Sequence, residues 1–138
     1  GVYYGQLALN GQGDELSYLN NQVLEQCVVY DYQNEKEIPV YDLEKANGKD
    51  PYELFLGGPL SLVTIENPNA DTDKELIIFR DSFGSSLAPL FAEGYKKITL
   101  VDIRYIQSAL LEKFISFENQ DVLFIYSTSV LNNSSTIK

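Results

Sequence analysis

The feature that most constrains the fold is an alternation of strands and helices in the second half of the chain. Short apolar runs at 75–79, 98–103 and 121–126 are typical of strands that are buried on both faces. Segments with helical periodicity, 86–95 and 105–117, separate them. Strand, helix, strand, helix, strand is the pattern of parallel β-α-β units. We therefore predict an α/β domain in which a parallel sheet carries flanking helices.

Each predicted helix has an apolar stripe that should face the sheet. The stripe of the first helix consists of Leu87, Leu90 and Phe91, and that of the second consists of Ile106, Leu110, Phe114 and Phe117. Gly94 is expected to end the first helix. A further strand is predicted at 60–66, followed by a turn at 67–71.

The chain of 138 residues suits a single domain, 1–138, with two less regular ends. Residues 1–48 are rich in Tyr, Asn, Gln and Glu, which predicts one or two short strands and irregular connections. A short helix is expected at 49–56, with Asp50 as its N-cap and Pro51 in its first turn. Residues 127–138 are expected to form a polar tail.

Composition excludes several classes of partner. The formal net charge of −10 argues against nucleic acid and against an anionic lipid surface. No apolar run approaches the roughly 18 residues of a membrane helix, so we expect no membrane contact by this segment. With one cysteine and no histidine, the chain offers no zinc site and no internal disulfide. Cys27 is expected to be a small buried hydrophobic residue. The absence of nucleotide-binding motifs predicts no cofactor.

Ligands of open α/β sheets bind at the carboxyl ends of the strands. At the end of the first apolar strand, Ser82 stands between Asp81 and Gly84 in a strand-to-helix turn. A serine there would lie near the helix N-terminus, where free N–H groups favour an oxyanion, and Gly84 would permit close backbone approach. The segment half-matches the nucleophile elbow G-x-S-x-G. In the alternative interpretation, Asp81, Ser82 or Ser85 simply caps the helix.

Asp102 and Arg104 close the next predicted strand, and Tyr126 ends the third. Asp102 and Arg104 should point to the same side because they are two residues apart. Arg104 would orient a carboxylate or stabilise an oxyanion, and Tyr126 would donate a hydrogen bond to the same site. The alternatives are a surface ion pair of little value and a tyrosine that anchors the sheet edge. Asp81 and Asp102 together would also suit Mg²⁺.

Several segments resemble the C-terminal half of the DHHW family, which is similar in turn to the SGNH-like alginate O-acetyltransferases. The resemblance covers about 50–126. It rests on the segments Asp50–Gly58, Leu76–Gly84, Leu87–Phe91, Val101–Tyr105 and Asp121–Tyr126, with D-S-F-G and V-D-x-R as the most specific elements.

The resemblance implies a flavodoxin-like (SGNH-like) sheet, present here as a partial domain of a longer, extracytoplasmic protein. It also implies an acyl-serine at Ser82, in an esterase or O-acetyltransferase that acts on cell-surface polysaccharide. The family's Asp–His partners lie upstream of the serine and have no counterpart in this chain, which also lacks a G-x-N-D segment. Because a serine needs an adjacent base, we expect the isolated chain to be inert toward esters. The alternative is a non-catalytic glycan-binding or cell-surface module, suggested by the ten tyrosines.

Overall fold

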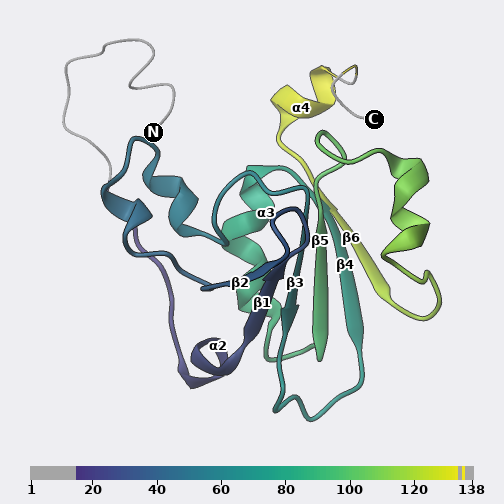
Figure 1. Ribbon diagram of the computed structural model, residues 1–138, viewed down its shortest axis with the longest axis horizontal. Coiled ribbons are helices and arrows are strands. Elements are labelled where there is room, and N and C mark those ends of the chain that lie inside the picture. The colour runs from purple at the N-terminus through teal and green to yellow at the C-terminus, as the bar shows by residue number, and fades with distance from the viewer. Residues whose placement is uncertain (1–14, 134, 136–138) are drawn as a thin grey trace.

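The structure, a computed structural model, describes residues 15–133 and 135. The predictions for 1–14, 134 and 136–138 lie outside the described residues. A six-stranded mixed sheet forms the centre, in the order β2-β1-β3-β5-β4-β6 (Figure 1). Its strands are β1 (Val28–Asp31), β2 (Lys36–Ile38), β3 (Leu62–Glu66), β4 (Glu75–Arg80), β5 (Lys97–Val101) and β6 (Asp121–Ile125). The α/β class and the predicted strands are confirmed.

Only part of the sheet is parallel. β4 lies between β5 and β6 and is parallel to both, which confirms the predicted β-α-β units. β3 pairs antiparallel with β5 and with β1, and β1 pairs antiparallel with β2, so the prediction of a parallel sheet is wrong for this half. Parallel neighbours need a crossover of about a dozen residues or more. The connection 67–74 between β3 and β4 is shorter than that, and β4 therefore runs opposite to β3.

The predicted helix 86–95 begins earlier and buries a different face. It comprises α3 (Ser82–Leu87) and the 3₁₀ helix η3 (Ala88–Phe91). Leu87 and Leu90 are exposed, and the buried residues are the small ones Gly84, Ser85, Ala88, Pro89 and Ala92. These residues recur every four positions, so the segment buries a neighbouring α-helical face that carries its small side chains; of the predicted stripe, Phe91 is partly buried against the core.

The second predicted helix is also 3₁₀. η4 (Ser108–Lys113) replaces the α-helix expected at 105–117. Leu111 and Ile115 pack on the sheet, whereas Leu110, Phe114 and Phe117 of the predicted stripe are exposed. Of the predicted stripe, Ile106 does pack against this core, and the rest of the contact is made by the neighbouring face that carries Leu111 and Ile115.

Short elements surround the sheet. They are α2 (Gln22–Gln26), η1 (Lys45–Asn47), η2 (Pro51–Leu54) and α4 (Thr128–Asn132). The Asp50 carboxylate caps η2 by accepting a hydrogen bond from the Tyr52 N–H, as predicted. α4 lies where we expected only a polar tail, and Ser127 is its N-cap. Cys27 is partly buried at the margin of the core, where burial raises the pKa of its thiol, so full burial was wrongly predicted.

Hydrophobic cores lie on both faces of the sheet because side chains alternate along each strand. In β4, Leu76 and Ile78 belong to the core that includes Ala88 of η3. Ile77 belongs to the core on the other face, together with Leu111 of η4. None of the helices in the described part of the chain combines the length and the apolar character that spanning a bilayer requires.

Candidate functional site

The predicted site residues meet at one edge of the sheet, where β4, β5 and β6 end (Figure 1). Arg80 is the last residue of β4 and pairs in register with Ile125 of β6. Asp102 directly follows β5, and Tyr126 directly follows β6. Because the three strands are parallel, their carboxyl ends coincide, and the three segments expected to carry chemistry lie side by side.

Ser82 is exposed at the first position of α3. The N-cap is Asp81, whose Oδ1 accepts a hydrogen bond from the Phe83 N–H at 3.0 Å. Its Oδ2 accepts another from the Ser127 N–H at 2.7 Å, and the Asp81 N–H donates to the Ile125 carbonyl oxygen at 3.2 Å. Asp81 thus joins α3 to the end of β6. The Ser82 hydroxyl is left without a hydrogen-bond partner among the residues that the structure describes.

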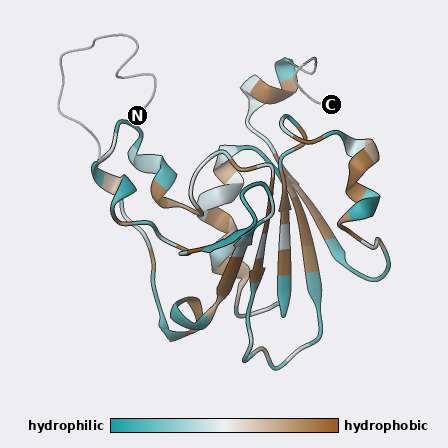
Figure 2. Ribbon diagram, viewed as in Figure 1, coloured by the Kyte–Doolittle hydropathy of each residue, from teal (hydrophilic) through white to brown (hydrophobic). Residues whose placement is uncertain are grey.

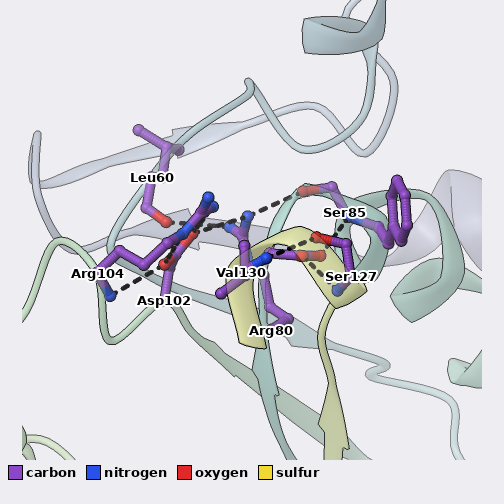
Figure 3. A network of polar contacts seen from close by, with 9 residues as sticks. Leu60, Arg80, Ser85, Asp102, Arg104, Ser127 and Val130 are labelled. Carbon is purple, nitrogen blue, oxygen red and sulfur yellow. Dashed lines mark hydrogen bonds and ion pairs between the residues drawn. The ribbon is translucent and has the colours of Figure 1, made fainter. Parts of the chain in front are cut away.

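Arg80, which stands where the elbow motif has its first glycine, is the site residue that sequence reasoning missed. Its side chain is fully buried and donates hydrogen bonds of 3.0 Å to Ser85 Oγ and to the Leu60 carbonyl oxygen (Figure 3). Its Nη1 lies 3.8 Å from Asp102 Oδ2. Burial lowers the pKa of Arg80, and the Asp102 charge opposes that effect. The signal in the sequence is an arginine that ends an otherwise apolar strand.

Gly84 is required by Arg80. A Cβ added at Gly84 would lie 2.4 Å from the Arg80 Cβ and 2.9 Å from its Cγ, distances that atoms so close to the backbone cannot relieve. The observed reason for a glycine is therefore the packing of α3 against the Arg80 stem. Backbone approach to a ligand, the role that we predicted, stays untested.

The Asp102–Arg104 pair is more than a surface ion pair. Asp102 is fully buried, and its carboxylate accepts hydrogen bonds from Arg104 Nε at 2.9 Å and from Nη2 at 2.6 Å (Figure 3). The Arg104 N–H donates a further bond to Oδ1. The hydrogen bond to Asp102 raises the pKa of Arg104. The Arg104 guanidinium also lies 5.2 Å from the centre of the Tyr105 ring. These bonds occupy Asp102 oxygens that a Mg²⁺ site would need.

The Tyr126 hydroxyl is buried and has no hydrogen-bond partner within the described part of the chain. Burial raises the pKa of Tyr126 to about 12, and the Asp102 charge adds to the effect. Tyr126 is therefore a neutral phenol at physiological pH and keeps its proton to donate. Buried donors without a partner call for an explanation, and an incoming ligand oxygen is one.

Taken together, the edge offers an exposed serine hydroxyl, an unused phenol donor and a guanidinium held in place by a buried carboxylate. Such donors stabilise negative charge on a reacting oxygen. No histidine occurs in the chain. The candidates for a general base near Ser82 are therefore the carboxylates of Asp81 and Asp102, and both already accept hydrogen bonds from other groups.

No protein-family model matches the chain, and no curated protein does. Solved structures do. Two structures of Bacillus cereus PatB1 overlay on 76% of the chain: one with a sulfonyl adduct, at 23% identity and a TM-score of 0.55, and one at 25% identity and a TM-score of 0.54. A DHHW family protein from Eubacterium siraeum overlays on the same share, at 25% identity and a TM-score of 0.50.

The matched region is 38% of the first PatB1 chain and 36% of the other two chains, so this chain spans less than half the length of those proteins. The resemblance inferred from the sequence is confirmed at the level of structure. The chain is an α/β domain with a mixed sheet, and it is similar in fold to part of PatB1 and of a DHHW family protein.

Proposed function

We propose that this chain is the serine-bearing part of an SGNH-like, flavodoxin-type esterase or O-acetyltransferase that acts on cell-surface polysaccharide. The observation that carries the proposal is the position of Ser82. It is exposed at the carboxyl end of the central parallel strand, while its neighbour Asp81 performs the capping role that would otherwise explain a serine there. An extracytoplasmic location follows from the proposed substrate.

In the proposed reaction, Ser82 Oγ attacks the carbonyl carbon of an ester and loses its proton to a base. The tetrahedral oxyanion accepts hydrogen bonds from the Tyr126 hydroxyl and from Arg104. Collapse expels the alcohol, which takes up the proton, and leaves the acyl group on Ser82. A sugar hydroxyl or water then attacks the acyl-serine and receives the acyl group, restoring the free serine.

We place the base outside the described residues. Asp81 faces the Phe83 and Ser127 N–H groups, so its oxygens are directed away from a proton-accepting role toward Ser82. We assign the base to a histidine in a longer parent protein, which is compatible with overlays that span only 36–38% of the solved chains. The isolated chain is accordingly inert toward esters.

Two further observations favour an acyl-serine at Ser82 over a turn with no chemical role. One solved PatB1 structure carries a sulfonyl adduct, and sulfonyl reagents attach to activated nucleophiles. On this chain, Phe83 and Tyr105 expose 57% and 53% of their surface beside Ser82 and Arg104 in the sequence. Exposed aromatic faces are suited to stacking on sugar rings, which agrees with a polysaccharide substrate.

The test uses the longest native chain that contains this segment, treated with a fluorophosphonate and followed by intact mass. The serine oxygen displaces fluoride from phosphorus, so we expect one adduct in the wild type and none in Ser82→Ala. Ser116→Ala is the matched control: Ser116 is also exposed, but Gln120 links it to Glu75 at the opposite end of β4. It should retain the adduct.

No adduct on the folded native chain would contradict the acyl-serine. The same exposed aromatics would then favour the second candidate, a non-catalytic glycan-binding module. Binding of a polysaccharide that is lost in Phe83→Ala and unchanged in Ser82→Ala would support that candidate.

A further inference from the structure

A chain of two hydrogen bonds ties α3, the helix that carries Ser82, to a distant segment of the sequence. The Tyr52 hydroxyl, in η2, donates a hydrogen bond of 2.7 Å to Ser86 Oγ. The Ser86 hydroxyl in turn donates to the Phe83 carbonyl oxygen at 3.2 Å. These two bonds, which we call the Tyr52–Ser86 link, therefore end on the residue that directly follows the proposed nucleophile.

The position of the Ser82 hydroxyl depends on the backbone beneath it. Within the described part of the chain this hydroxyl has no hydrogen-bond partner, so side-chain contacts do not fix its direction. α3 spans only six residues, Ser82–Leu87, and a helix that short gains little stability from its own hydrogen bonds. Contacts with neighbouring segments are therefore needed to hold its first turn in place.

Asp81 and the Tyr52–Ser86 link hold the two backbone groups of Phe83. The Asp81 carboxylate accepts a hydrogen bond from the Phe83 N–H, and the Ser86 hydroxyl donates to the carbonyl oxygen of the same residue. A serine that bonds back to a carbonyl oxygen of its own helix is a common local feature. The bond from Tyr52, 34 residues away in the sequence, is the part that adds support from outside the helix.

Tyr52 is itself fixed well enough to provide that support. Its N–H donates to the Asp50 carboxylate at 3.1 Å, and Pro51 restricts the backbone just before it. Its ring lies 5.0 Å from the ring of Phe55, which is buried. Figure 2 shows that hydrophobic residues dominate the strands, whereas η2 and α3 also carry hydrophilic ones, so a polar contact between these two segments agrees with their composition.

We propose that Tyr52 is a positioning residue for Ser82, which acts through Ser86 to hold the first turn of α3 in the orientation that an incoming ester requires. Tyr52 does not itself touch the ester. The inference rests on the proposed function, because it concerns the reactivity of Ser82. A displacement of about 1 Å can cost a reaction roughly 100-fold in rate, so the loss of a single supporting hydroxyl slows acylation even where the fold persists.

The test measures how fast the longest native chain reacts with the fluorophosphonate at several reagent concentrations. Tyr52→Phe and Ser86→Ala each break the Tyr52–Ser86 link. Each should lower the limiting labelling rate by about 10-fold and leave the half-saturating concentration unchanged. The double variant should be no slower than the slower single variant, because the same link is broken in all three. Ser86→Thr keeps a hydroxyl and should restore the wild-type rate.

Tyr95→Phe is the matched control for a purely structural role. Tyr95 is also half-buried, and its hydroxyl donates a hydrogen bond of 2.9 Å to Asp121, at the opposite end of β6 from the site. Tyr95→Phe and Tyr52→Phe should lower the melting temperature to a similar extent, but only Tyr52→Phe should slow labelling. Equal slowing in both variants, or a wild-type rate in Tyr52→Phe, would overturn the positioning role.

Hydrogen–deuterium exchange separates this inference from the proposed function. In Tyr52→Phe, the amides of 83–87 should exchange about 10-fold faster than in the wild type, because the first turn of α3 has lost its outside support. Faster exchange in a native chain whose wild type takes no adduct would contradict the acyl-serine and support the Tyr52–Ser86 link. Unchanged exchange overturns the link, whether or not Ser82 is labelled.

Discussion

The side chains of Arg80 and Asp102 form an ion pair with no exposed surface, across the ends of the neighbouring parallel strands β4 and β5. Nη1 of Arg80 lies 3.8 Å from Oδ2 of Asp102. The same carboxylate holds Arg104 through two hydrogen bonds, so one buried aspartate serves two guanidinium groups. This arrangement links the buried framework of the site to the arginine that reaches its surface.

Removing the buried guanidinium of Arg80 should lower the stability of the fold, because the buried Asp102 carboxylate loses one of its positively charged partners. Arg80→Met is expected to lower the free energy of unfolding by about 3–5 kcal/mol, measured by urea denaturation. Combined with Asp102→Asn, it should cost at least about 1 kcal/mol less than the sum of the single variants, because the two residues interact directly. Additive effects would show that the pair contributes nothing through its mutual attraction.

Gly84 should not tolerate a methyl group. Gly84→Ala places a Cβ 2.4 Å from the Arg80 Cβ, and we expect a loss of about 1–3 kcal/mol in the free energy of unfolding. Gly94→Ala is the control, because its nearest neighbour atom would be 3.7 Å away. Equal stability of the two variants would contradict the close packing of α3 on Arg80.

Replacing Ser82 and Ser85 by alanine should change the stability of the protein to different extents. Ser85 is buried and accepts the Arg80 hydrogen bond, so Ser85→Ala leaves a charged donor without its acceptor and should cost about 1–3 kcal/mol. Ser82 is exposed, and Ser82→Ala should change stability by no more than about 0.5 kcal/mol. Thermal unfolding of both variants decides this. A large loss in Ser82→Ala would point to a structural role for that hydroxyl.

Tyr126 should make stability depend on alkaline pH. The pKa of Tyr126 is raised from 10.0 to about 12 in the folded protein by burial. Below pH 10 the phenol is protonated in both states and has no effect. Between pH 10 and about 12 only the unfolded state releases the proton, so the free energy of unfolding falls as pH rises.

Tyr126→Phe should therefore flatten the decline in stability across this alkaline range, as measured by urea denaturation at several pH values. Tyr105→Phe, which alters an exposed tyrosine, is the control. An unchanged pH dependence in Tyr126→Phe would show that the phenol is not held in its neutral form.

The sequence predicted the strands well and the helix faces poorly. Continuous apolar runs such as Leu76–Ile78 have few alternatives to a buried strand, and the three parallel strands followed from the intervening helical segments. The stripes were right at Phe91 and Ile106, which pack against the cores, and wrong at Leu90 and Phe114, which are exposed. Periodicity offers neighbouring helix faces, and packing against the sheet decides which of them is buried.

For the site, the sequence by itself determined which segments meet, because parallel strands bring their carboxyl ends together at one edge. Ser82, Asp102, Arg104 and Tyr126 were placed there on that ground alone. The tertiary structure decided which groups are occupied and which are free: Asp81 caps α3, Asp102 binds two arginines, and the Tyr126 hydroxyl has no partner within residues 15–133 and 135. It also revealed Arg80 as the buried centre of the network. Burial and hydrogen-bond partners depend on contacts between distant segments, such as Arg80 with Leu60, and local sequence patterns do not record those contacts.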